Sequence, residues 1–236
     1  MIVAAAACPH PPMLVPELAA GAALDLAPLR AACDAAVGAL LAARPDDVIV
    51  VGTGASRRRF GPGDHGSFAP YGLDVPVGFG PPSGERFADL SLLVAAWLLA
   101  RVSGAPYPAS AITLPAQTSA EECRAVGRRL AELGGQRRVA LLVMGDAAAS
   151  RALADPDTRD GDADEFDRLA AAAFASGDPA ALRDLDGDQA ARVHAAGWVP
   201  WQVLSAATAG RRWRADLLYS ETPLEVTYLV ATWRLP

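Results

Sequence analysis

Apolar residues along the chain alternate between short continuous runs and longer stretches with helical spacing. Continuous apolar runs at residues 2–7, 48–51 and 139–144 predict strands that are covered on both faces. Shorter strands are expected at residues 75–79, 111–114, 214–219 and 226–233. Apolar residues with a period near 3.6 predict helices between the strands. These helices are expected at residues 24–43, 85–101, 166–175, 180–185, 189–196 and 200–207.

Two stretches carry additional local signals. Residues 118–122 (TSAEE) provide a capping box in two registers, which opens a helix that ends at Gly134-Gly135. Residues 52–74 are rich in Gly and predict a long loop. Loops of that length inside compact domains are usually either functional or disordered, so this one is a candidate for carrying functional groups.

The alternation of strands and helices predicts an α/β fold. Helices are expected on both faces of a mixed, mainly parallel central sheet, which is a three-layer α/β/α arrangement. The chain has 236 residues and shows no internal repeat, linker or low-complexity boundary. We therefore expect residues 1–236 to form one domain.

Composition narrows the class of protein. Apolar residues make up 52% of the chain and charged residues 20%, which is typical of a globular protein and not of a disordered one. The net charge of −6 argues against binding to nucleic acid or to an anionic membrane surface. The longest strongly apolar run, at 92–99, is too short to cross a bilayer. The sequence contains no Lys, which excludes a lysine Schiff base and a P-loop lysine.

The three cysteines indicate a reducing compartment. Cys8, Cys33 and Cys123 are odd in number, far apart in sequence, and form no C-x-x-C pair. This pattern is typical of reduced thiols, and the first residues lack the basic region of a signal peptide. We therefore expect a cytoplasmic protein.

Three polar side chains follow predicted strands in a way that brings them together. His10 follows the strand at 2–7, His65 lies in the loop after the second strand, and Asp146 follows the strand at 139–144. If these strands are parallel, all three residues face one crevice beyond their carboxyl ends. Two imidazoles and a carboxylate suit a non-haem Fe(II) site, and they also suit catalytic Zn²⁺.

Each of these residues also has an ordinary structural interpretation. His10 could simply pack against the neighbouring prolines, and His65 could be exposed in its Gly-rich loop. Arg57 and Arg59, in a run of three arginines, could hold a substrate carboxylate or could form a solvated charge run. His194 lies in a predicted helix and fits a surface or helix-packing position.

Several short blocks resemble a known family. The opening CPHPPMLVPE at 8–17 is similar to the start of the LigB-type class III extradiol ring-cleavage dioxygenases, especially an actinobacterial subunit-B-like branch. Further blocks at 66–72, 145–146, 201–204 and 228–233 extend the resemblance over nearly the whole chain. The resemblance implies a three-layer α/β/α fold, usually a homodimer, and an Fe(II) held by two His and one Glu or Asp.

The resemblance also implies roles for individual residues. His10 matches the first histidine ligand and His65 resembles the second, while the carboxylate ligand is either Glu221 or Glu225, with Glu221 preferred. Active members carry a further histidine after the strand at 139–144, which acts as an acid and base. Asp146 stands in that stretch here and is a weaker substitute, since a carboxylate's ordinary pKa lies near 4.

These observations lead to one expected function and two rivals. The chain is expected to be a metal-dependent oxidoreductase acting on a small phenolic or catecholic substrate, with Asp146 as proton relay. Arg57 and Arg59 would orient an anionic substituent of that substrate. The rivals are a Zn²⁺-dependent hydrolase on the same scaffold, and a non-catalytic binding or assembly protein that kept the fold.

Overall fold

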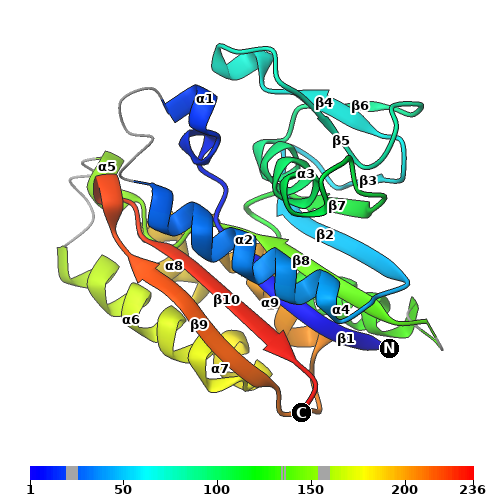
Figure 1. Ribbon diagram of the computed structural model, residues 1–236. Coiled ribbons are helices and arrows are strands. Elements are labelled where there is room, and N and C mark those ends of the chain that lie inside the picture. Colours follow the sequence, from blue (N-terminus) through cyan, green and yellow to red (C-terminus); the bar gives the residue numbers. More distant parts are fainter. Residues whose placement is uncertain (20–25, 134, 136, 154–159) are drawn as a thin grey trace.

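The computed structural model describes residues 1–19, 26–133, 135, 137–153 and 160–236. A seven-stranded sheet with the order β3-β7-β2-β8-β1-β10-β9 runs through the molecule (Figure 1). The four central strands β7, β2, β8 and β1 are parallel, while β3 and β10 are antiparallel to the strands beside them. The seven strands are β1 (Ile2–Cys8), β2 (Asp47–Thr53), β3 (Arg58–Phe60), β7 (Ser110–Leu114), β8 (Val139–Met144), β9 (Arg214–Glu221) and β10 (Tyr228–Arg234).

Helices cover both faces of this sheet. On one face lie α2 (Ala27–Ala42) and α3 (Leu90–Ser103), which pack in one apolar cluster with alternate residues of the strands. On the other lie α4 (Ala120–Leu133), α6 (Asp160–Ser176), α7 (Pro179–Arg183), α8 (Gly187–Arg192) and α9 (Trp198–Ala207). The predicted α/β class with helices on both faces of a mixed sheet is confirmed.

The strands β1 and β8 are apolar at every position because both of their faces are buried. In β8, Val139, Leu141 and Val143 point into the cluster under α4 and α9. Ala140 and Leu142 point into the cluster under α2 and α3. This alternation explains why the sequence shows a continuous apolar run and not a polar–apolar alternation.

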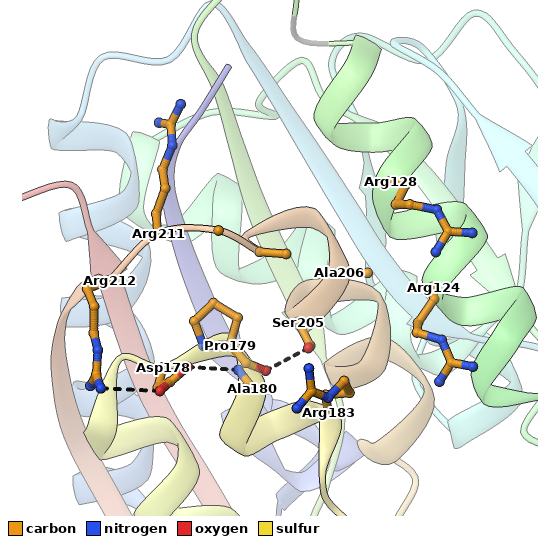
Figure 2. A pocket seen from close by; sticks show the side chains of 12 residues that line it. Arg124, Arg128, Asp178, Pro179, Ala180, Arg183, Ser205, Ala206, Arg211 and Arg212 are labelled. Carbon is orange, nitrogen blue, oxygen red and sulfur yellow. Dashed lines mark hydrogen bonds and ion pairs between the residues drawn. The ribbon is translucent and has the colours of Figure 1, made fainter.

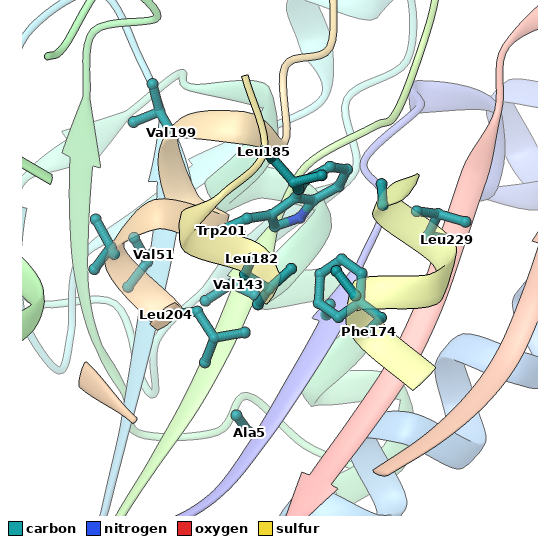
Figure 3. Close-up of a cluster of buried hydrophobic side chains, with 14 of the residues drawn as sticks. Ala5, Val51, Val143, Phe174, Leu182, Leu185, Val199, Trp201, Leu204 and Leu229 are labelled. Carbon is teal, nitrogen blue, oxygen red and sulfur yellow. The ribbon is translucent and has the colours of Figure 1, made fainter. Parts of the chain in front are cut away.

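Aromatic side chains pack among the aliphatic ones in the cluster on the α9 face (Figure 3). The rings of Phe174 and Trp201 lie edge to face, with centroids 5.2 Å apart. The indole N–H of Trp233 donates to the carbonyl oxygen of Phe174 at 2.8 Å. These contacts hold α6 and α9 against β10.

A second, smaller sheet interrupts two predicted elements. β4 (His65–Ser67) pairs with β5 (Pro76–Gly78) and with β6 (Arg86–Phe87). The long loop predicted at 52–74 is instead interrupted by two short strands, β3 and β4. The predicted helix at 85–101 begins only at Leu90, because Phe87 instead packs in β6 against the rings of Phe60 and Phe79.

Other boundaries differ less. Of the two predicted capping registers, Ser119 and Glu122 form one, with the Ser119 hydroxyl donating to Glu122 Oε2 at 2.8 Å. The predicted helix at 189–196 ends at Arg192, since His194 has a φ of 55° that does not continue a helix. Residues 24 and 25 of the predicted helix at 24–43 lie outside the described residues.

None of the described helices combines the length and the apolar character that a membrane-crossing helix requires. The described part of the chain therefore offers no helical membrane span.

Candidate functional site

The carboxyl ends of four parallel strands meet at one edge of the large sheet (Figure 1). β1 ends at Cys8 and β8 at Met144, and these two residues lie side by side in the ladder. The residues two positions further along each chain segment are His10 and Asp146. The pairing of β1 with β8 therefore sets these two side chains next to each other, as the strand order predicted.

His10 and Asp146 form the centre of the site. The backbone N–H of His10 donates to Asp146 Oδ1 at 2.8 Å. The imidazole Nδ1 lies 3.6 Å from the same oxygen, which is too long for a hydrogen bond, and Nδ1 is buried without a partner in the described structure. The side chains of His10 and Asp146 are 10% and 18% exposed, so solvent reaches this pair only at its rim.

Two glycines allow the loop that carries Asp146 to pack so closely. A Cβ on Gly145 would lie 2.2 Å from the Cα of Gly197, so no other residue fits at position 145 without a shift of the backbone. The carbonyl oxygen of Asp146 accepts a hydrogen bond from the N–H of Gly197 at 2.8 Å. Asp146 is therefore held between the end of β8 and the start of α9.

A hydrogen-bond network continues behind Asp146. The carboxylate of Asp167 on α6 accepts from the N–H of Ala148 at 2.9 Å and from the hydroxyl of Thr227 at 2.6 Å. Arg151 donates to the same carboxylate at 3.1 Å. The N–H of Ala148, the hydroxyl of Thr227 and the guanidinium of Arg151 all donate to the one carboxylate of Asp167. These shared hydrogen bonds make the loop after β8 rigid.

Weakly acidic side chains that the sequence analysis did not single out surround Asp146. Burial raises the pKa of the Tyr228 hydroxyl, and the charge of Asp146 raises it further. Burial also raises the pKa of the Cys33 thiol. Its hydrogen bond to Cys8 and the negative charge of Asp146 raise that pKa further. These groups stay protonated around a carboxylate. The antiparallel return of β10 along β1, which places Tyr228 at this edge, is the signal that could have identified them.

His65 lies in the small sheet, in β4. Its backbone N–H donates to the carbonyl oxygen of Glu85 at 3.0 Å, and its buried Nδ1 has no partner in the described structure. Among the described residues, no hydrogen bond or ion pair joins His65 to His10 or Asp146. The alternative interpretation, in which His65 is exposed in an open loop, is wrong, since the side chain in β4 is half-buried.

Glu221 ends β9 and lies opposite Tyr228 in the ladder between β9 and β10. It therefore lies at the same edge of the sheet as His10. The two residues are separated by two strand spacings of about 4.8 Å each. Glu221 is exposed, and its carboxylate raises the pKa of Tyr219, after the larger effect of burial. Glu225 is also exposed, in the turn before β10, with a φ of 63°.

The predicted ligand set does not come together as a centre that is ready to bind metal. Within the described residues there is no group of three or more His, Cys, Asp or Glu side chains that could hold a metal ion. His10, His65 and Glu221 are all described and are therefore not such a group. The residues at this site do not fit a three-ligand Fe(II) or Zn²⁺ centre, although His10 and His65 each keep a buried Nδ1 without a partner in the described structure.

The arginines predicted to hold a substrate lie at the far side of the sheet. Arg59 is in β3, and the strands β7, β2 and β8 separate it from β1. Arg57 and Arg59 instead line a hollow of about 230 Å³ against α4. The fold does not bring Arg57 or Arg59 to the His10–Asp146 pair.

Comparisons with known proteins add information on the fold alone. No protein-family model matches the chain, and no curated protein matches it. A crystal structure of an uncharacterized protein, JW3007 from Escherichia coli K12, is similar, with a TM-score of 0.57 and 13% sequence identity. The similarity covers 98% of this chain and 99% of that one. The chain thus shares its α/β architecture with that protein over the whole length of both.

Proposed function

We propose that this protein binds a small phenolic or catecholic molecule at the His10–Asp146 site. The observation that carries the proposal is the buried imidazole of His10, whose Nδ1 has no partner in the described structure. A buried polar atom without a partner is costly, and a ligand hydroxyl would satisfy it. The resemblance to the extradiol dioxygenases supports the class of ligand.

The neighbouring groups support an acid–base role for His10. Imidazole is the side chain that most often transfers protons in enzymes. Asp146 holds the backbone of His10 and places a negative charge 3.6 Å from Nδ1. Because Nδ1 has no partner in the described structure, a phenolic O–H that donates to it can pass its proton to the imidazole. Asp146 then acts by positioning and charge, and Tyr228 beside it stays neutral.

The binding proposal is tested by calorimetric titration of the protein with catechol. We expect His10→Ala to weaken catechol binding about tenfold, the value of one buried hydrogen bond. His194→Ala removes an exposed histidine outside the site and is the matched control, which we expect to bind as the wild type does. Catechol binding that is absent in the wild type, or equal in wild type and His10→Ala, contradicts the proposal.

A second candidate is the metal-dependent oxidoreductase that the resemblance implies. The observation in its favour is that both His10 and His65 keep a buried Nδ1 without a partner. Among the described residues, no group of three or more His, Cys, Asp or Glu side chains could hold a metal ion. This counts against the oxidoreductase, and equally against a Zn²⁺-dependent hydrolase.

Metal analysis separates these candidates. The protein is purified without chelator, analysed for metals, and analysed again after anaerobic loading with Fe(II). Stoichiometric iron that is lost in both His10→Ala and His65→Ala, with catechol-dependent oxygen uptake, would establish the oxidoreductase. Turnover that needs Zn²⁺ and no oxygen would establish the hydrolase. If the protein binds catechol but no metal, only the proposed binding function is supported.

We further propose a cytoplasmic location and a homodimer. The location is supported by the three buried cysteines, all of which are free thiols in the described structure. The dimer is supported by the family resemblance. Light scattering at several protein concentrations tests it, and a mass of one chain at every concentration would exclude the dimer.

A further inference from the structure

A cleft lined by arginines lies on the helical layer, away from the His10–Asp146 site (Figure 2). It has a volume of about 450 Å³ and is formed by α4, α7, α9 and the turn before β9. Five arginines and one aspartate line it, an excess of four positive charges in a chain whose net charge is −6. The charged lining residues are Arg124, Arg128, Asp178, Arg183, Arg211 and Arg212.

Most of this charge is not neutralised by the protein. Arg212 lies 3.4 Å from Asp178, and Arg183 lies 2.9 Å from Asp184. In the described part of the chain, Arg124, Arg128 and Arg211 take part in no hydrogen bond or ion pair. Their guanidinium groups thus keep free donors. Figure 2 shows Arg124 and Arg128 near each other on α4, and Arg211 at the opposite side of the cleft with its side chain extending away from that pair.

The packing of α4 on α9 creates this arrangement. A Cβ on Gly127 would lie 2.4 Å from the carbonyl oxygen of Val203, so the two helices cross at a distance that only glycine permits. Arg124 and Arg128 are four residues apart on α4, so they share one face of the helix. Two like charges at that spacing repel each other, and an anion between them would relieve the repulsion.

The chemistry of the lining identifies the class of ligand. Guanidinium groups bind phosphate and carboxylate through paired hydrogen bonds, and a cleft of this volume holds a molecule of metabolite size. The remaining lining residues are small, such as Pro179, Ala180 and Ala206, and include no aromatic ring for stacking a nucleobase.

We propose that the arginine cleft binds a small molecule that carries at least two phosphate or carboxylate groups. One anionic group lies between Arg124 and Arg128, and the other lies toward Arg211. The cleft is separate from the His10–Asp146 site, because Arg211 and Arg212 precede β9 at the opposite edge of the sheet. The proposal therefore does not depend on the function proposed for that site.

Titration calorimetry in a buffer free of phosphate and sulfate tests the proposal. Pyrophosphate, with two phosphate groups, and citrate, with three carboxylates, are the probes with several anionic groups, and inorganic phosphate is the probe with a single group. We expect pyrophosphate or citrate to bind at least about tenfold more tightly than phosphate, since a second charge-assisted contact is worth roughly that factor. The tighter of the two identifies phosphate or carboxylate as the preferred group.

Two variants and a matched control locate the binding. Arg128→Gln removes an exposed arginine from the cleft and is expected to weaken binding about tenfold. Ala209→Glu places a negative charge at the rim and is expected to weaken it at least as much. Arg86→Gln removes the same charge from β6, outside the cleft, and is expected to bind as the wild type does. Equal losses in Arg128→Gln and Arg86→Gln, or no binding of either polyanion to the wild type, would overturn the proposal.

Discussion

The His10–Asp146 site and the arginine cleft place polar groups in opposite ways. At the first site, the carboxylate of Asp146 already accepts a hydrogen bond from the backbone N–H of His10. The weakly acidic side chains around it, Tyr228 and Cys33, are buried and neutral. At the second, three guanidinium groups stand without partners in the described structure, in an open cleft. The first site is therefore suited to one uncharged hydroxyl group, and the second to a ligand with several negative charges.

The two regions also differ in how firmly the fold holds them. The loop of Asp146 is tied to α6, α9 and β10 by hydrogen bonds to buried groups. The arginines of the cleft extend from helix surfaces into solvent, where salt screens each charge and a single ion pair is worth little. A ligand of the cleft must therefore contact several arginines at once to bind tightly.

Substitution of the two close-packed glycines is expected to have the largest effect on stability. Gly145→Ala places a Cβ 2.2 Å from backbone at Gly197, and Gly127→Ala places one 2.4 Å from backbone at Val203. We expect each to lower the free energy of unfolding by about 3 kcal/mol, because backbone cannot move as freely as a side chain. Urea denaturation measures this loss.

The same two variants separate the two sites. Gly145→Ala is expected to weaken catechol binding and leave pyrophosphate binding unchanged, and Gly127→Ala is expected to do the reverse. Gly38→Ala is the control, since nothing lies within 4 Å of a Cβ at that position of α2. If Gly145→Ala and Gly127→Ala unfold at the same urea midpoint as Gly38→Ala, the prediction is wrong. The backbone at these two positions then shifts to accept a Cβ at little cost in stability.

The sequence was sufficient to predict the first region because topology determines it. Buried parallel strands appear as continuous apolar runs, and their carboxyl ends share one edge, so His10 and Asp146 could be expected to meet. The part of the prediction that depended on a loop was less successful. His65 belongs to a small sheet whose strands have two or three residues, and such short strands carry almost no periodic signal.

The arginine cleft could not be predicted in the same way. Its arginines come from α4, α7 and the turn before β9, and no local pattern relates these positions. They converge because Gly127 lets α4 approach α9, and a single glycine in a helix does not reveal which helix it will contact. The arginine run that the sequence does display, around Arg57 and Arg59, lies beyond three intervening strands from β1.

Alkaline pH is also expected to destabilise both regions. Burial raises the pKa of the Cys123 thiol on α4 to about 11, from an ordinary value of 9.0, and it raises the pKa of Tyr228 at the other site. As the pH rises above 9.0, the unfolded chain loses the Cys123 proton while the folded chain keeps it. Stability therefore falls between pH 9.0 and about 11, by up to about 3 kcal/mol for this thiol.

Variants assign this alkaline loss to one region or the other. Cys123→Ala is expected to flatten the fall in unfolding free energy between pH 9.0 and about 11, and Tyr228→Phe to flatten it at higher pH. The slope is compared and not the absolute stability, because each variant also loses packing. A slope that stays unchanged in Cys123→Ala would mean that this thiol is not buried in the folded protein.

The smallest expected effect concerns the charge of Asp146. Asp146→Asn keeps an oxygen that can accept the N–H of His10, so we expect a loss of stability below about 1 kcal/mol, whereas Asp146→Ala leaves that N–H without an acceptor and costs about 1–2 kcal/mol. The charge itself has a separate readout. Because Asp146 raises the pKa of Tyr228, Asp146→Asn is expected to lower that pKa, which ultraviolet titration of the tyrosines measures. An unchanged tyrosine titration would mean that burial alone raises the pKa, and that Asp146 acts on the site only through its hydrogen bond to His10.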